Sequence, residues 1–250
     1  MPAIIELDNL THRFADGTIG VEGITLAIEE GAFVVIAGAN GSGKTTLLHH
    51  LNGLLQPTSG SVRVAGACVK EDPIQARVRV GMVFQDADSQ IVGETVRDDV
   101  AFGPENLRLD RIEVERRVSD ALSATGLVHL ADKRPHLLSG GEKRRLAIAG
   151  ILAMGPRVIV FDEPFANLDY HGVRQVLDQM LRQHRAGRTI VVTTHDLEKV
   201  LAHADRLIFM RGGRVEGDGP PLSLVAQSEA FGVHRPRSAE LGVEALSWLN

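Results

Sequence analysis

A chain of 250 residues with 44% hydrophobic and 24% charged residues can bury a core, and this composition is typical of one globular domain or a domain with an inserted lobe. The net charge is −5 and the basic residues are scattered, which disfavours a nucleic acid as the main ligand. The apolar runs are shorter than the roughly 20 residues that cross a bilayer. The first ten residues predict a strand, not a signal peptide, and the single cysteine, Cys68, suits a reducing compartment.

The chain begins with short strand-like segments, a glycine-rich loop and a helix expected over residues 45–54. Residues 86–137 are polar and have a helical period, most clearly over residues 111–125, which indicates an inserted helical lobe. Strands and helices then alternate again. The expected strands are residues 3–7, 24–28, 33–37, 158–161, 189–193 and 207–210.

These boundaries predict a division into residues 1–85, residues 86–137 as the helical subdomain, residues 138–218 as the rest of the core, and a tail over residues 219–250. Prolines interrupt the tail, and residues 239–249 are expected to form a short amphipathic helix that contains Trp248, the only tryptophan.

The residues GANGSGKT, at positions 38–45, match the pattern GxxxxGK[ST] between a strand and a helix. Backbone N–H groups of such a loop converge on phosphate at a helix N-terminus, and glycines allow the close approach. Lys44 would reach the β and γ phosphates, and the Thr45 hydroxyl would bind Mg²⁺. A plain glycine turn is the alternative. The expected binding residues here are Gly38, Asn40, Gly41, Ser42, Gly43, Lys44, Thr45 and Thr46.

Two carboxylates, Asp162 and Glu163, follow the apolar run VIVF. A buried central strand would deliver them to its carboxyl end, where open α/β sheets bind ligands. Asp162 can hold Mg²⁺ and Glu163 can polarise the water that attacks the γ phosphate. Alone, the pair would equally suit the start of a helix, but the glycine loop favours the catalytic interpretation.

The segment LSGGE, at residues 138–142, places Ser139, Gly140 and Gly141 before another helix, which makes a second anion-receptive N-terminus. In this segment the chain resembles the ATP-binding cassette (ABC) ATPases, whose signature motif is LSGGQ. The resemblance implies two ATP molecules, each with Mg²⁺, between two head-to-tail subunits. The three residues would act on the nucleotide of the partner, which is either a second copy or a paralogue.

The remaining family motifs occur in the expected order. The resemblance implies that Gln85 senses Mg²⁺ and the γ phosphate, that Asp169 lies in a loop touching the partner subunit, and that His195 is the switch histidine. Phe14 is expected to stack on adenine. Glu142 departs from the usual glutamine, and we expect altered detail and retained activity. The fold implied is an α/β P-loop NTPase of the ABC type, with a mainly parallel core sheet, an antiparallel β portion and the inserted helical subdomain.

The segments FQDADSQIVGETVRDDVAFGPENL and AIAGILAMGP resemble the ATPases of energy-coupling factor transporters, which import vitamins or cobalt and nickel ions. This resemblance implies a peripheral position on the cytoplasmic face of the membrane, a membrane scaffold protein and a separate membrane subunit that captures the substrate. We expect the scaffold to contact residues 94–102, with Glu94, Asp98 and Asp99 receiving its arginines. A merely solvated acidic helix is the alternative.

A soluble ABC ATPase that remodels a cytosolic protein assembly is the competing function. A chromosome or repair ATPase is a third possibility, which the acidic charge balance disfavours.

Overall fold

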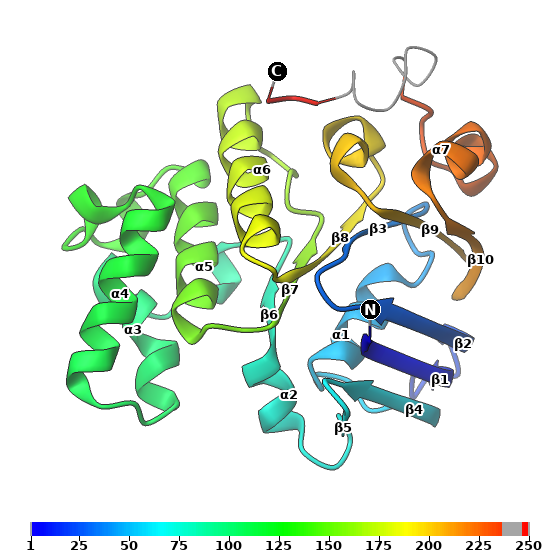
Figure 1. Ribbon diagram of the computed structural model, residues 1–250, viewed down its shortest axis with the longest axis horizontal. Helices are drawn as coiled ribbons and strands as arrows, with labels where there is room; N and C mark the ends of the chain where they lie inside the picture. Colours follow the sequence, from blue (N-terminus) through cyan, green and yellow to red (C-terminus); the bar gives the residue numbers. More distant parts are fainter. Residues whose placement is uncertain (1, 237–246, 250) are drawn as a thin grey trace.

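The computed structural model describes residues 2–236 and 247–249. Three parts lie side by side in it: a helical lobe, a central sheet with helices along it, and a smaller antiparallel sheet that contains the N-terminus (Figure 1). This arrangement confirms the predicted α/β architecture, in which a mainly parallel sheet, an antiparallel β portion and an inserted group of helices share one chain.

The central sheet has six strands in the order β10-β9-β3-β8-β7-β6, and only the β9–β10 pairing is antiparallel. Every residue of β3, β6, β7 and β8 is buried, as expected for parallel strands covered on both faces. The strands are β3 (Phe33–Ala37), β6 (Val80–Val83), β7 (Val158–Asp162), β8 (Thr189–Thr194), β9 (Arg206–Arg211) and β10 (Arg214–Gly219).

The smaller sheet has the order β2-β1-β4-β5, with all pairs antiparallel. Its apolar residues join one hydrophobic cluster with helix α1 and with one face of the central sheet, so α1 lies in a shared core between the two sheets. The strands are β1 (Ala3–Arg13), β2 (Ile19–Glu29), β4 (Ser59–Val64) and β5 (Ala67–Cys68).

Helices on the core flank the central sheet, and α6 buries its apolar side in the second large cluster. The helix expected over residues 45–54 ends early, at Leu51, because Gly53 adopts a φ of +70°. The core helices are α1 (Lys44–Leu51), α2 (Pro73–Arg79), α6 (Tyr170–Arg185) and α7 (Pro221–Leu224).

The helical lobe consists of α3 (Val96–Asn106), α4 (Arg111–Thr125) and α5 (Gly140–Met154). Helix α4 has the bounds predicted from the sequence. All three helices contribute to one cluster, while Ile148 and Ile151 of α5 pack into the cluster of the central sheet. The lobe's hydrophobic core therefore continues beyond residue 137, the boundary expected from the sequence, because α5 has buried side chains on both sides.

Residues after β10 return to the core. Helix α7 leads into the 3₁₀ segment Val225–Phe231, and the Phe231 ring stacks on Phe209 with centroids 4.5 Å apart. Most of the helix expected over residues 239–249 lies outside the described residues. The described tail residues lie against α6, where the Trp248 ring centroid is 5.3 Å from that of Tyr170.

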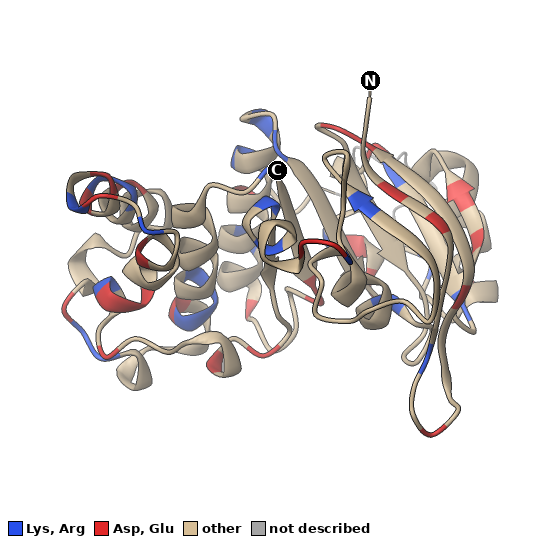
Figure 2. Ribbon diagram, turned by 90° about the horizontal axis from the view of Figure 1, so that it is seen from below, with Lys and Arg blue, Asp and Glu red and all other residues tan. Residues whose placement is uncertain are grey.

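None of the helices that the structure describes has the length and apolarity needed to cross a membrane. In the view from below, basic and acidic residues both occur in the helical lobe and in the sheets (Figure 2).

Candidate functional site

The loop formed by residues 38–45, here called the phosphate loop, requires glycine at several positions. Gly41 and Gly43 have φ values of +78° and +99°, which favour glycine. A Cβ on Gly38 would lie 2.3 Å from the Met210 carbonyl oxygen, and one on Gly43 would lie 2.5 Å from the Gly20 carbonyl oxygen. The loop thus packs tightly against its neighbours before helix α1 begins at Lys44.

Lys44 is almost fully buried at the centre of this loop. Its Nζ donates to the carbonyl oxygens of Gly38, at 2.7 Å, and Ala39, at 3.1 Å. Glu163 Oε1 lies 3.8 Å from the same nitrogen. Burial lowers the Lys44 pKa, and the charges of Glu163 and Asp162 act in the opposite direction. Among the described residues, the ammonium group therefore has an anionic neighbour but only carbonyl hydrogen-bond partners, and an incoming phosphate would compete for it.

Asp162 ends strand β7, and both of its carboxylate oxygens accept hydrogen bonds from threonines. Thr45 Oγ1 donates to Oδ2 at 2.8 Å, and Thr193 Oγ1 donates to Oδ1 at 2.6 Å. The first bond joins the phosphate loop to the carboxyl end of the sheet, as the motif spacing predicted. Thr193 was not anticipated, since only its place at the end of an apolar strand next to β7 could have indicated it.

Glu163 follows with a φ of 45°, an unusual conformation for a residue with a side chain. Its backbone N–H is held by Thr193 O at 3.2 Å. His195 Nδ1 lies 3.0 Å from Glu163 Oε2. The other carboxylate oxygen, Oε1, is buried without a hydrogen bond from the described residues. The site thus contains a carboxylate with one oxygen held and one oxygen available.

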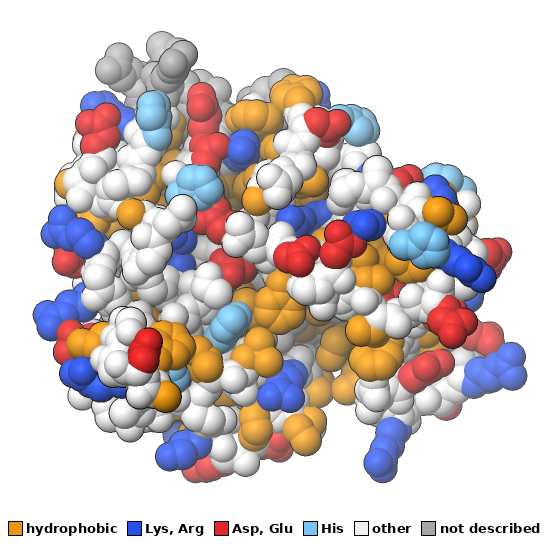
Figure 3. Space-filling view, turned by 180° about the vertical axis from the view of Figure 1, so that it is seen from behind, with side chains coloured by type: hydrophobic (Ala, Val, Ile, Leu, Met, Phe, Trp, Pro, Cys, Tyr) orange, Lys and Arg blue, Asp and Glu red, His pale blue; other side chains and the backbone are white. Residues whose placement is uncertain are grey.

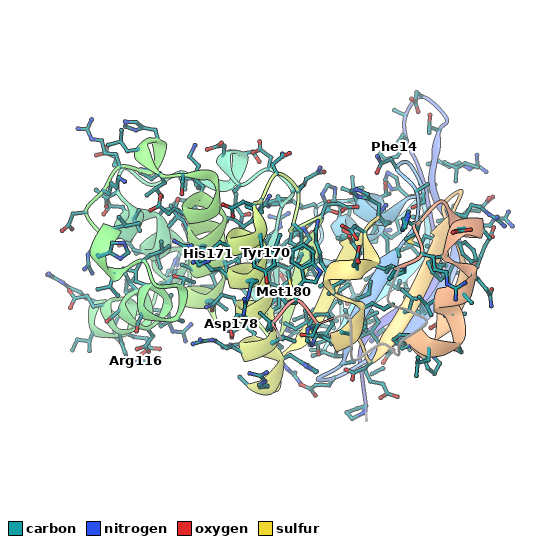
Figure 4. The ribbon with its side chains drawn as sticks, turned by 90° about the horizontal axis from the view of Figure 1, so that it is seen from above. Phe14, Arg116, Tyr170, His171, Asp178 and Met180 are labelled. Atoms are coloured by element: carbon teal, nitrogen blue, oxygen red, sulfur yellow. The ribbon has the colours of Figure 1, made fainter. Side chains whose placement is uncertain are left out.

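A pocket of about 350 Å³ opens over these groups. Its lining brings together residues 40–45 of the phosphate loop, the next residue of α1, Thr46, and the side chains of Phe14, Gln85, Glu163 and His195. Gly38 and Asp162 lie below this lining and reach it through Lys44 and Thr45. Phe14, in the turn between β1 and β2, is 39% exposed and presents an aromatic surface at the far end from the helical lobe (Figure 4). The size and lining suit a nucleotide, with the phosphates at α1.

Besides Gly38 and Asp162, four more predicted residues are absent from this lining: Ser139, Gly140, Gly141 and Asp169. Ser139 caps α5, and its N–H and Oγ both donate to Glu142 Oε2, at 2.7 and 2.8 Å. Gly140 and Gly141 follow in the first turn, with open space at their Cβ positions. Asp169 caps α6 by accepting from Gly172 N at 2.7 Å. Within one chain these residues lie at the N-termini of α5 and α6, outside the pocket, which leaves them available to another nucleotide site.

The prediction of an acidic helix face over residues 94–102 is wrong in part. Glu94 precedes the N-cap Thr95, so it is not on helix α3. Asp98 faces solvent but forms a capping box with Thr95. Asp99 is buried, and its Oδ1 accepts from Val92 N at 2.7 Å and Gly93 N at 2.9 Å. Local capping and loop closure thus use two of the three acids, because the loop before α3 folds back over its first turn.

A groove of about 360 Å³ lies between the lobe and the central sheet, and we call it the lobe groove. Asp99 contributes to its lining, which is otherwise mainly apolar. Hydrophobic side chains gather in a hollow between the two parts of the molecule in the space-filling view (Figure 3). The apolar side chains that line the groove include Leu54, Phe84, Val92, Phe102, Ile151 and Met154.

Comparison with known proteins agrees with this geometry. Residues 21–166 match the family model described as ABC transporter. The energy-coupling factor transporter ATP-binding protein EcfA of Methanocaldococcus jannaschii is 43% identical over 244 residues, which cover 95% of this chain and 88% of that protein. The structure of CbiO1 from Clostridium perfringens, described as part of the ABC transporter complex CbiONQ, is 36% identical with a TM-score of 0.83, over 96% of this chain and 99% of that one.

A further solved structure is a dimer of the ATP-binding cassette MJ0796, in a post-hydrolysis state bound to ADP and phosphate. It is 28% identical, with a TM-score of 0.78, and the match covers 87% of this chain and 98% of that one.

Proposed function

The chain belongs to the ABC transporter family and is an ATPase, and from this membership and the site geometry we propose that it powers a membrane importer of the energy-coupling factor type. The relative in Methanocaldococcus is named as an energy-coupling factor transporter subunit and the one in Clostridium as part of an ABC transporter complex, which supports this assignment. The imported substrate is a vitamin or a cobalt or nickel ion on this proposal, and the chain lies at the cytoplasmic face of the membrane.

The phosphate loop binds the phosphates, and Lys44 turns from the carbonyls of Gly38 and Ala39 toward them. Phosphate oxygens are stronger acceptors than carbonyls for a buried ammonium group. Phe14 stacks on adenine at the other end of the pocket.

Mg²⁺ fits the residues present, because the Thr45 hydroxyl and the Asp162 carboxylate, 2.8 Å apart, are hard oxygen donors beside the phosphate loop. Gln85 lines the same pocket, and its side-chain oxygen would be the third donor to Mg²⁺. Bound there, Mg²⁺ would neutralise charge on the phosphates.

Glu163 is the acceptor for the proton of the attacking water. The observation that carries this role is its pair of unequal oxygens, with Oε2 held by His195 and Oε1 free beside Lys44. His195 orients the carboxylate and contacts the γ phosphate. Ser139, Gly140 and Gly141 of one subunit contact the nucleotide of the other in a head-to-tail dimer, and Asp169 lies at the same interface. The dimeric relative bound to ADP and phosphate supports this assembly.

The test replaces Glu163 by glutamine, which keeps the size and removes the base. We expect ATP-dependent dimerisation to persist and steady-state phosphate release to fall by about 100-fold or more. Glu115→Gln, on the exposed surface of α4, is the matched control. Wild-type phosphate release from Glu163→Gln would refute the assigned role.

The scaffold protein docks in the lobe groove through a short amphipathic helix. The groove combines exposed apolar side chains, among them Leu54 at 44% and Phe102 at 54%, with the Asp99 carboxylate in its lining. A helix with an apolar face and one arginine complements this chemistry. The groove lies between the lobe and the central sheet. A helix docked there would move when the two subunits close.

Phe102→Asp should abolish recovery of small hydrophobic subunits with this chain in detergent, while ATP binding is retained. Ile112→Asp is the control, since Ile112 is 81% exposed on α4 and is not in the groove lining. Recovery of the wild-type chain with soluble scaffold proteins in place of hydrophobic subunits would favour the competing function, remodelling of a cytosolic assembly.

A further inference from the structure

Arg144 is a buried cation on helix α5, with only 5% of its surface exposed. Its Nη1 donates to the Phe84 carbonyl oxygen at 2.5 Å, and its Nη2 donates to the Gln85 carbonyl oxygen at 2.7 Å. Its Nε is buried without a hydrogen bond from the described residues. Both terminal nitrogens of the guanidinium group therefore donate to the backbone of the segment that follows β6.

This arrangement costs stability. No carboxylate among the described residues forms an ion pair with Arg144, and burial lowers its pKa, with the charge of Asp86 acting in the opposite direction. Buried cations normally pair with an anion, and an apolar residue of similar size is often as stable or more so. Stability of the fold alone does not account for arginine at this position.

The two accepting carbonyls lie on either side of the Gln85 Cα atom. Fixing both peptide planes fixes the direction in which the Gln85 side chain leaves the backbone, toward the pocket that it lines. The planar fork of arginine can hold two carbonyls at once, which a single ammonium group does less well. A neighbouring ion pair, Lys143 Nζ to Asp88 Oδ1 at 2.6 Å, joins α5 to the same segment.

Helix α5 also has Ser139 as its N-cap, with Gly140 and Gly141 in its first turn. Arg144 therefore lies between two functional elements of the chain: it shares a helix with the signature residues and holds the backbone of Gln85. Because a helix is rigid over such a short length, a displacement of Gln85 is transmitted to the N-terminus of α5.

We propose that Arg144 is a positioning residue that couples Gln85, at the chain's own nucleotide, to the signature residues that serve the nucleotide of the partner subunit. The inference rests on the proposed function, because it takes the roles of Gln85 and Ser139 from it. A nucleotide bound at one site then changes the position of the signature residues that contact the nucleotide at the other site. The two sites of the dimer therefore hydrolyse ATP cooperatively.

The experiment compares Arg144→Met and Arg144→Lys with the wild-type chain in the assembled dimer. For each we measure the thermal unfolding midpoint, ATP affinity, and phosphate release as a function of ATP concentration. Arg144→Met should unfold at or above the wild-type temperature and bind ATP within a few-fold of wild type. Its kcat should fall by about 10- to 100-fold, since a small misplacement of an active-site group has this effect, and cooperativity between the sites should be lost. Arg144→Lys should be intermediate.

Arg117→Met is the matched control. Arg117 also donates to two backbone carbonyls, those of Ala153 at 3.3 Å and Met154 at 3.0 Å, but it lies outside the nucleotide pocket. We expect it to lower the unfolding temperature and to leave kcat unchanged.

Two results would overturn the inference: unchanged kcat and cooperativity in Arg144→Met, or a loss of activity that only parallels a loss of stability. Failure of the proposed function looks different, because then the wild-type chain itself would release no phosphate, or Glu163→Gln would release it at the wild-type rate.

Discussion

His195 Nδ1 lies 3.0 Å from Glu163 Oε2, and this contact joins the ends of two adjacent parallel strands. His195 is exposed, whereas the Glu163 side chain is mostly buried. The histidine thus approaches the carboxylate from the solvent side, and it leaves the second oxygen facing Lys44.

If His195 orients Glu163, then His195→Ala should lower kcat more than it weakens ATP binding. We expect a fall in kcat of about 100-fold, the lower range for loss of an acid–base group. His195→Gln, which can still donate a hydrogen bond, should retain more activity. The measurement is phosphate release at saturating ATP, with His129→Ala in the lobe as the control. Equal losses in His195→Ala and His129→Ala would contradict the prediction.

Thr45 should link Mg²⁺ to the phosphate loop through its hydroxyl. Thr45→Val keeps the shape and removes the bond to Asp162, so ATP affinity with Mg²⁺ should fall by about tenfold or more, as for other ligand-shell changes. Affinity in the presence of a chelator should change much less. Thr45→Ser restores the hydroxyl and serves as the control. A Thr45→Val chain that binds ATP with equal Mg²⁺ dependence would exclude the role.

Glu142 should make stability depend on pH at the acidic end. Hydrogen bonds from the Ser139 N–H and then from its hydroxyl lower the Glu142 pKa below its usual 4.5. A lowered carboxyl pKa contributes stability above the usual value, and that contribution is lost as the pH falls through the lower folded-state pKa. In Glu142→Gln the unfolding temperature should therefore depend less on pH below pH 5 than it does in the wild-type chain. An unchanged slope would show that the capping box does not titrate in this way.

The same carboxylate lies at the N-terminus of α5, which we propose contacts the nucleotide of the partner subunit. Glu142→Gln removes a negative charge there, so ATP should drive dimerisation at lower concentration. Sedimentation of the variant in a Glu163→Gln background measures this. A dimer that needs more ATP than the Glu163→Gln chain alone would contradict it.

His50 on α1 should weaken the fold in mild acid. It is fully buried, and burial, with the neighbouring His12, lowers its pKa from 6.5 to about 4. The folded state favours the neutral form of His50. Its contribution to the free energy of unfolding is therefore fully present above pH 6.5 and is lost as the pH falls toward 4. The shift corresponds to about 3 kcal/mol. His50→Leu should reduce the difference between urea midpoints at pH 7 and pH 5, and His129→Leu should not.

Much of the site followed from local patterns. The phosphate loop depends on glycines whose spacing is visible in the chain, and Asp162 ends a run of apolar residues that is typical of a buried strand. Four strands were not predicted: β5 and β6 are only two and four residues long, and β4 and β10 are partly exposed. The roles of Arg144 and Thr193 were not predicted for another reason, because each forms hydrogen bonds with residues far away in the sequence.

The acidic residues before and within α3 illustrate the same limit. Their spacing suggested a face for a partner, but whether a carboxylate faces solvent depends on how the preceding loop folds. Asp99 receives two backbone N–H groups and becomes part of the lobe groove.

The sequence by itself determined the chemistry of this protein: a loop for phosphate, a pair of carboxylates at a strand end, and a second helix N-terminus, because these depend on residue types at short spacing. Only the tertiary structure decided which groups meet. Strand order brings Thr45, Asp162 and Thr193 within hydrogen-bonding distance, and the packing of α5 against β6 holds Arg144 on the Gln85 backbone. Such contacts join residues distant in the chain, and packing of the whole core fixes them.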